Sequence, residues 1–209
     1  MADMRLYDSN DMVKVGCHDC TGCSSCCQNM GSSVLLDPYD AHRLCKGLGM
    51  NFQDLMNKFV ELHMEDGLIY PNLRMAETTE RCVFLNEEGR CSIHALRPGI
   101  CRLFPLGRNY SKDRIQYFVL TDACPVKSKT KMKVSRWLAE ENLKIYEQYL
   151  IRWHNLTKCL REEMHAELQT DGGEERCRNR SMEFLQYFYM LPYEGEFFAE
   201  WAKRMDAWE

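Results

Sequence analysis

The feature that most constrains this chain is a run of cysteines near its start. Residues 17–27 read CHDCTGCSSCC, and five of these eleven residues are cysteine. A C-x-x-C spacing lets a tight backbone turn direct two thiolates at one metal ion, and here such pairs overlap. The neighbours Cys26 and Cys27 project in different directions. They therefore either face two centres, or one of them binds metal and the other supports it.

Four more cysteines follow in the middle of the chain: Cys82, Cys91, Cys101 and Cys124. We expect them at hairpin and turn positions, where backbone N–H groups can point at sulfur. Cys124 precedes Pro125. A tight C-x2-C-x2-C run completed by a distant Cys-Pro is also found in bacterial ferredoxins, whose cysteines bind iron–sulfur clusters. The spacing of the cysteines in this chain differs from the ferredoxin spacing.

Composition bears on whether these cysteines bind metal or form disulfides. The chain has 209 residues, of which twelve are cysteine, and a formal net charge of −4. No stretch approaches the ~18 apolar residues of a membrane helix, and the first residues lack the pattern of a secretory signal. We therefore expect a cytoplasmic protein, in which patterned cysteines more often bind metal than form disulfides. The acidic balance argues against general nucleic-acid binding.

The order of these motifs resembles one known family. The segments CTGCSSCC at 20–27, CVFLNEEGRCSIHALRPGICRLFPLG at 82–107, and then Cys124-Pro125 are similar to the CxxCxxCC cysteine-cluster family of YkgJ-like proteins, described as zinc- or iron-chelating. The resemblance covers roughly residues 17–126, and His94 stands where the family usually has tyrosine. A related domain occurs in flagellin lysine-N-methylase, which implies an iron–sulfur cluster and a link to methyl transfer.

The resemblance implies a set of eight metal ligands. These are Cys20, Cys23, Cys26, Cys27, Cys82, Cys91, Cys101 and Cys124. Eight thiolates are enough for two four-coordinate zinc ions, for two 4Fe–4S clusters, or for one closed site with spare thiols. Overlapping spacings and a vicinal Cys-Cys favour iron–sulfur clusters, because several irons spread the required ligand directions. Zinc is the alternative cofactor.

A thiolate centre of net negative charge needs nearby compensation. We expect Arg97 and Arg102 to donate hydrogen bonds to sulfur or to an anion beside the centre; pairing with surface carboxylates is an equal alternative. Two functions stay open. The first is a redox or catalytic role for an iron–sulfur centre, acting on a protein or small-molecule substrate. The second is a structural zinc scaffold or metal-handling protein without catalysis. No catalytic residue can be identified.

The remaining cysteines are assigned by their surroundings. Cys45 and Cys159 follow apolar helical positions and are expected to be buried small hydrophobes. Cys177 lies in polar sequence and is expected to be exposed, while Cys17 is a ninth ligand, a resolving thiol or a bystander. The aromatic segment 182–201 is expected to pack in the core, with a homodimer through these helices as the alternative.

Hydrophobic periodicity predicts a mostly helical α+β fold. Residues 34–70 are expected to form two helices, started by Asp37-Pro38 and by Asn51. Two short strands around NEEGR and a strand at 114–120 follow. From 134 one long helix is expected up to 170–173, and shorter helices after it. We expect residues 1–133 to form an irregular cysteine-rich metal-binding domain with short β-hairpins, and residues 134–209 to form a helical extension packed on it.

Overall fold

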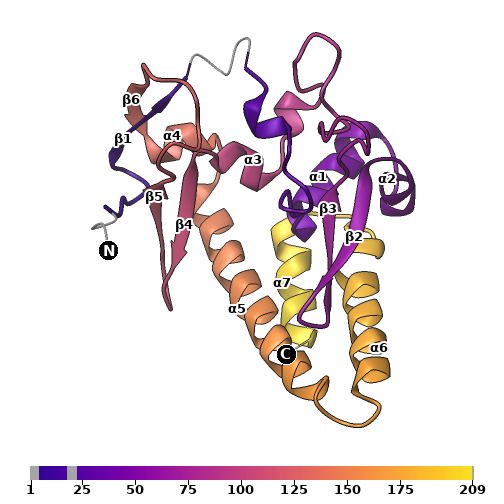
Figure 1. Cartoon of the computed structure of the whole chain (residues 1–209). Coiled ribbons are helices and arrows are strands. Elements are labelled where there is room, and N and C mark those ends of the chain that lie inside the picture. Colours follow the sequence, from indigo (N-terminus) through magenta and orange to yellow (C-terminus); the bar gives the residue numbers. More distant parts are fainter. Residues whose placement is uncertain (1–4, 18–22, 209) are drawn as a thin grey trace.

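The computed structural model describes residues 5–17 and 23–208, and it confirms an α+β fold. The strands are β1 (Met12–Gly16), β2 (Val60–Glu65), β3 (Leu68–Leu73), β4 (Leu106–Tyr110), β5 (Ile115–Val119) and β6 (Thr130–Lys133). The α-helices are α1 (Pro38–Leu48), α2 (Phe52–Phe59), α3 (Gly99–Leu103), α4 (Val134–Leu138), α5 (Leu143–Glu167), α6 (Gly173–Leu185) and α7 (Phe197–Trp208). Two antiparallel hairpins, β2–β3 and β4–β5, a two-stranded antiparallel pair of the distant strands β1 and β6, and a series of helices make up the described part of the molecule (Figure 1).

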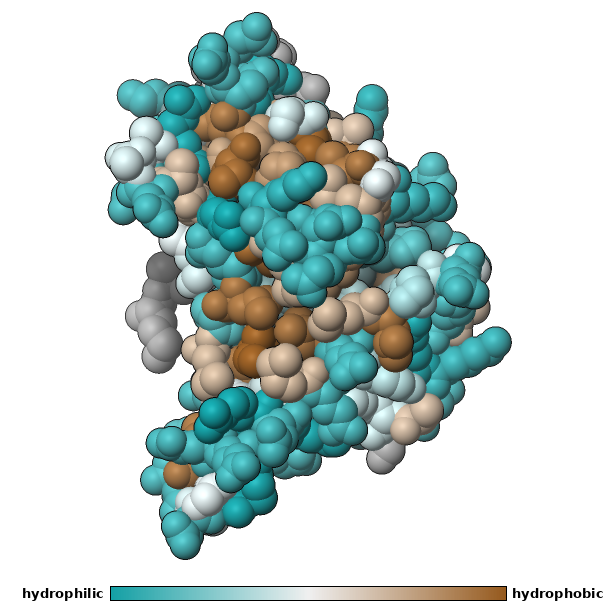
Figure 2. Space-filling model, turned by 90° about the vertical axis from the view of Figure 1, so that its right-hand side faces the viewer, coloured by the Kyte–Doolittle hydropathy of each residue, from teal (hydrophilic) through white to brown (hydrophobic). Residues whose placement is uncertain are grey.

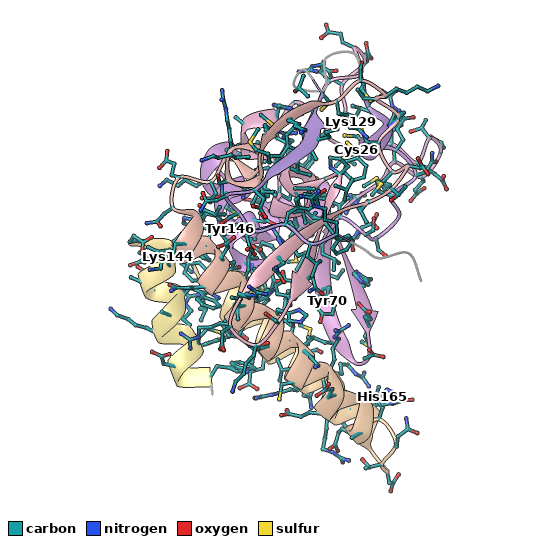
Figure 3. All side chains as sticks on the ribbon, turned by 90° about the vertical axis from the view of Figure 1, so that its left-hand side faces the viewer. Cys26, Tyr70, Lys129, Lys144, Tyr146 and His165 are labelled. Carbon is teal, nitrogen blue, oxygen red and sulfur yellow. The ribbon has the colours of Figure 1, made fainter. Side chains whose placement is uncertain are left out.

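Within residues 5–17 and 23–208, three short turns of helix complete the fold. They are the 3-10 turns η2 (Ser25–Cys27) and η3 (His94–Leu96), and the π-helical turn η4 (Gln186–Met190). Helices α5 and α6 run antiparallel and form one end of the molecule, and the cysteine-bearing turns lie at the other end (Figures 1 and 3). In the view of Figure 2, hydrophobic residues reach the surface in the upper part, while the end formed by the α5–α6 turn is mostly hydrophilic.

The first two helices begin where the sequence predicts. The Asp37 side chain accepts a hydrogen bond from the Asp40 amide at 2.8 Å, and Asn51 caps α2 through the Asp54 amide at the same distance. Each cap satisfies one of the amides that a helix start leaves without a partner. Helix α1 ends at Gly49, whose φ of 65° lies in the left-handed region that glycine adopts readily.

The predicted second helix is too long. We expected the two helices to account for residues 34–70, but the chain leaves α2 at Phe59 and enters the β2–β3 hairpin. The turn between the strands is Asp66-Gly67, with φ of 49° and 82°. Asp-Gly with two positive φ values is a strong hairpin signal, and it outweighs the short helical pattern before it. Ser181 of α6 then donates to the Gly67 carbonyl at 2.6 Å and holds the turn in place.

The predicted long helix from 134 is also interrupted. Helix α4 stops at Leu138, Ala139 has a φ of 50°, and α5 starts at Leu143. The break places Glu140 in the interior, where its carboxylate meets Arg102 at 2.5 Å and accepts from the Tyr39 hydroxyl at 3.1 Å. A buried ion pair therefore lies at the break between α4 and α5.

The region around NEEGR has less regular structure than expected. The predicted strands appear as isolated bridges between Leu85 and Cys91 and between Met75 and Cys82. The strand expected at 114–120 is confirmed as β5, which pairs with β4. Strand β1 pairs with β6, with Gly16 opposite Thr130. A β-carbon at Gly16 would collide with the Thr130 side chain, so glycine permits this close approach.

One continuous core joins the two halves of the chain. Its buried residues run from Val13 and Val15 of β1 to Trp201 and Met205 of α7. The aromatic residues of 182–201 contribute to it, as expected; Phe184, Phe188, Phe197 and Trp201 are all buried. The division into domains at 133/134 and the homodimer stay predictions. Within the described residues, α5 is the longest helix, and like the others it has no apolar stretch that could cross a bilayer.

The Asp66-Gly67 turn gives a first test. Gly67→Ala should lower the free energy of unfolding by about 1 kcal/mol or more, because the new methyl meets positive φ and would lie 3.1 Å from Cβ of Met164. Asp66→Gly, one residue earlier, should change it by less than about 0.5 kcal/mol. Urea unfolding of both variants measures the difference. Equal stability of the two variants would contradict the turn assignment.

Candidate metal centre

Two segments far apart in the sequence are joined beside the first cysteine run. The Cys82 amide donates to the Cys27 carbonyl at 2.8 Å, and the Asn29 amide donates to Glu80 at 2.8 Å. A bridge between Gln28 and Arg81 lies between them. This short ladder brings the 3-10 turn η2, which carries Cys26 and Cys27, next to the turn that carries Cys82.

The turns at Cys82 and Cys91 have similar local geometry. In each, the amide of the residue two positions further on, Phe84 or Ile93, donates a hydrogen bond to the cysteine sulfur. Such bonds favour the thiolate over the thiol. The expectation that backbone N–H groups point at sulfur in these turns is confirmed for both cysteines.

Cys101 enters the centre from helix α3, which is fixed from the opposite side. The Asp40 carboxylate of α1 accepts from the Gly99 amide at 2.7 Å. Gly99 has no room for a side chain, because a β-carbon there would lie 2.2 Å from the Tyr146 hydroxyl. Sequence reasoning missed Asp40 as a positioning residue, since an acidic residue in the first turn of a helix is also explained by the helix dipole.

Four thiols gather at this point: Cys26, Cys82, Cys91 and Cys101. They are close enough for Cys26 to raise the pKa of each of the other three, in addition to the effect of burial. The pKa of Cys26 is raised first by its contact with the Cys27 thiol and then by burial. Figure 3 shows sulfur atoms near the labelled Cys26, at the end of the molecule away from His165.

The chemistry of these side chains suits a bound cation, although their positions do not form a coordination site. Among residues 5–17 and 23–208, no three Cys, His, Asp or Glu side chains are arranged so that they could hold a metal ion as they stand. Four half-buried or buried thiols are nevertheless a donor set that suits zinc or iron. Binding lowers thiol pKa values, because the cation stabilises the thiolate. The raised pKa values therefore describe the thiols without such a charge.

A second group of thiols lies on the other side of Cys26. Cys17, Cys23 and Cys124 line a small cavity together with Cys26 and the prolines Pro105 and Pro125. Strand pairing of β1 with β6 brings Cys17 into this part of the molecule, and Lys129 donates to the Cys124 carbonyl at 3.3 Å. Cys20 lies outside the described residues. Of the predicted ligands, Cys27 contacts Cys26, and both Cys23 and Cys27 also line the larger cavity described below.

The two predicted arginines have different surroundings. The positive charge of Arg97 acts on Cys26 and on Cys91 and partly opposes the rise in their pKa values. The Nε of Arg97 donates to the His94 carbonyl at 3.1 Å. Arg102 is buried and pairs with Glu140, with Tyr146 beneath its guanidinium. We expected these arginines either beside sulfur or paired with surface carboxylates. Arg97 lies beside sulfur, whereas Arg102 pairs with a carboxylate that is buried.

The four thiols line a mostly apolar cavity. Its volume is about 500 Å³, which is within the usual range for small-molecule sites. Beyond the cysteines the walls are apolar and include Met75, Phe84 and Leu106. The cavity reaches partly exposed side chains at Ile100 and Leu120, so the thiols face a space that continues to solvent.

The cysteines outside the predicted set are partly misassigned by sequence. Cys45 is half-buried against the core, in line with its apolar surroundings. Cys159 is exposed, with its sulfur 3.2 Å from Glu163, whereas Cys177 is 3% exposed beneath α5. Both predictions were wrong, because the face that α5 and α6 present to each other depends on their packing. His94 lines the cavity beside Arg97.

Asp40 gives a pH-dependent test of how α3 is held. Burial and the neighbouring Asp37 raise its pKa to about 8, against the opposing effect of Arg102 and Arg108; an unfolded aspartate has a pKa near ~3.9. The folded state therefore binds more protons between these values, so the Asp40 contribution to stability falls as pH rises from about 4 through about 8. Asp40→Asn removes this dependence.

We expect the free energy of unfolding of D40N, relative to the unsubstituted chain, to increase steadily between about pH 4 and about pH 8 and to level off above that. Asp54→Asn is the matched control, because Asp54 occupies the same capped position in α2 but is exposed. Denaturant titrations at each pH measure both differences. Parallel pH profiles for D40N and the unsubstituted chain would contradict the buried, protonated carboxyl.

Comparison with known proteins agrees with the chemistry of these thiols. The family profile described as "Putative zinc- or iron-chelating domain", CxxCxxCC, matches residues 19–135. No curated protein and no solved structure matches the chain. The matched segment contains the eight predicted ligand cysteines and spans more than half of the 209 residues. The chain therefore belongs to the CxxCxxCC family of metal-chelating cysteine domains.

Proposed function

We propose that this protein holds an iron–sulfur cluster through Cys26, Cys82, Cys91 and Cys101, and that the cluster has a redox or catalytic role. The observation that carries the proposal is the position of these thiols in the lining of a cavity of about 500 Å³ that continues to solvent. A purely structural site is closed, with all ligands used and packed, whereas a reactive centre needs an approach path.

Ligand geometry also supports iron over zinc. The four thiols come from three separate turns and one short helix, and Cys26 lies between two groups of sulfurs. A single tetrahedral ion requires four sulfurs aimed at one point, but a 4Fe–4S cluster accepts one sulfur at each of several irons. The second group, with Cys17, Cys23 and Cys124, could hold a second centre, which Cys20 would complete.

A structural zinc site is the second candidate, and a specific observation favours it. Between Leu73 and α3 the described chain has only isolated bridges and the 3-10 turn η3. Such a segment has turns and isolated bridges in place of a regular sheet or a longer helix, and metal binding can supply folding free energy to it. In this case the protein is a scaffold or metal-handling factor, and no reaction takes place in the cavity.

The location and the partners that the sequence predicts are the same for both candidate functions. We propose a cytoplasmic protein that acts on a protein or small-molecule partner, without membrane or nucleic-acid binding. The aromatic residues of the C-terminal helices are largely used in the core, so a homodimer would have to use their remaining exposed side chains. Sedimentation of the purified protein tests this association.

Metal analysis after anaerobic purification separates the two candidates. We expect a brown protein that contains iron and acid-labile sulfide in equal amounts, with a broad visible absorption that disappears on reduction or exposure to air. Colourless protein with stoichiometric zinc and no sulfide would contradict the cluster and support the scaffold. Zinc analysis of the same sample is the control for incomplete cluster loading.

Cysteine substitutions test the ligand set. Cys91→Ser and Cys101→Ser should each lose most of the bound metal and lower the melting temperature, since metal binding is expected to be coupled to folding. Cys23→Ser should remove only about half of the metal if the second group holds its own centre. Cys159→Ser, at an exposed thiol, is the control and should keep all of it. Full metal content in Cys91→Ser and Cys101→Ser would exclude the proposed ligands.

A further inference from the structure

The cavity beside the thiols has a marked imbalance of charge. Arg90 and Arg97 line it next to the cysteines, and no aspartate or glutamate is among its lining residues in the described part of the chain. The rest of the lining is dominated by apolar side chains such as Met75, Phe84 and Leu106. A cavity with cationic groups at one end and apolar walls elsewhere suits an anion that carries an apolar body.

Arg97 has the geometry to bind such an anion. Its Nε is held by the His94 carbonyl at 3.1 Å, which fixes the guanidinium plane. In residues 5–17 and 23–208, neither terminal nitrogen of Arg97 has a hydrogen-bond or ion-pair partner, and neither is sealed in the interior. A guanidinium oriented in this way presents two parallel donors, the arrangement that binds a carboxylate or a phosphate.

A third arginine of the cavity, Arg108, differs in this respect. Its Nη2 donates to the Tyr146 hydroxyl at 3.3 Å. Its guanidinium also lies over the Tyr146 ring. Arg108 is therefore engaged in the buried network behind α3, and Arg97 is the better candidate for contact with a ligand.

We propose that the cavity binds a small organic anion, with its charged group on Arg97 beside the thiols and its apolar body against Met75, Phe84 and Leu106. The mouth lies at Ile100 and Leu120, which are 39% and 37% exposed. This inference rests on the proposed function, because it places the ligand next to the metal centre. The ligand is an oxyanion on a short hydrocarbon chain. It is either a carboxylate or a phosphate monoester.

Calorimetric titration of the metal-loaded protein tests the proposal with four probes of equal chain length. Hexanoate and hexyl phosphate are the anionic probes, hexanol is neutral and hexylamine is cationic. At least one anion should bind, and the neutral and cationic probes should bind about tenfold more weakly or not at all. Acetate should bind more weakly than hexanoate, because it lacks the apolar body. Equal binding of hexanol, or no binding of either anion, would overturn the proposal.

Two matched pairs of variants locate the ligand. Arg97→Met should weaken anion binding about tenfold or more, while Arg178→Met, at an exposed position on α6, should leave it unchanged. Leu120→Glu places a negative charge at the mouth and should weaken binding of the anions, whereas Leu120→Gln should not. Unchanged affinity in both Arg97→Met and Leu120→Glu would place the ligand elsewhere and overturn the assignment.

Metal content measured on the same samples keeps the two proposals separate. If Arg97→Met keeps its metal and loses the anion, the arginine serves the ligand. If it loses the metal, the arginine compensates the charge of the centre and the ligand assignment fails. If the unsubstituted protein holds no metal but still binds hexanoate through Arg97, the proposed function fails and the anion site stands.

Discussion

The hydrogen bond from the Cys82 amide to the Cys27 carbonyl is the contact on which the thiol group depends. With the neighbouring bond from Asn29 to Glu80, it joins the first cysteine run to the middle of the chain. Neither partner segment belongs to a longer sheet, so these few bonds and the turns beside them set where Cys26 and Cys82 lie. Without them, the C-x-x-C run would have no fixed relation to Cys91 and Cys101.

Bringing four thiols together in a half-buried place has an electrostatic cost. Each buried thiol resists ionisation, and each neighbouring thiolate would add repulsion. Amide donors on Cys82 and Cys91 and the charge of Arg97 reduce this cost, but they do not remove it. A bound cation removes it, which is the physical reason for assigning metal binding to this arrangement of residues.

Helix α3 connects the thiol group to the helical part of the chain. One side of it carries Cys101 toward the cavity, and its start is held by Asp40 of α1. Arg102, the next residue, enters the buried pair with Glu140 at the junction between α4 and α5. The C-terminal helices therefore take part in positioning a cysteine of the candidate centre, although they carry none of its expected ligands.

The sequence by itself determined the chemistry of this protein: the thiols, the family, the helix starts at Asp37 and Asn51, and the α+β class. These follow from residue type and short-range spacing, which are local properties. Only the tertiary structure decided which thiols share a site, that Cys177 is buried and Cys159 exposed, that Asp40 holds α3, and that Glu140 lies at the break between α4 and α5. Each of these depends on contacts between residues distant in the chain, and spacing along the chain carries no information about such contacts.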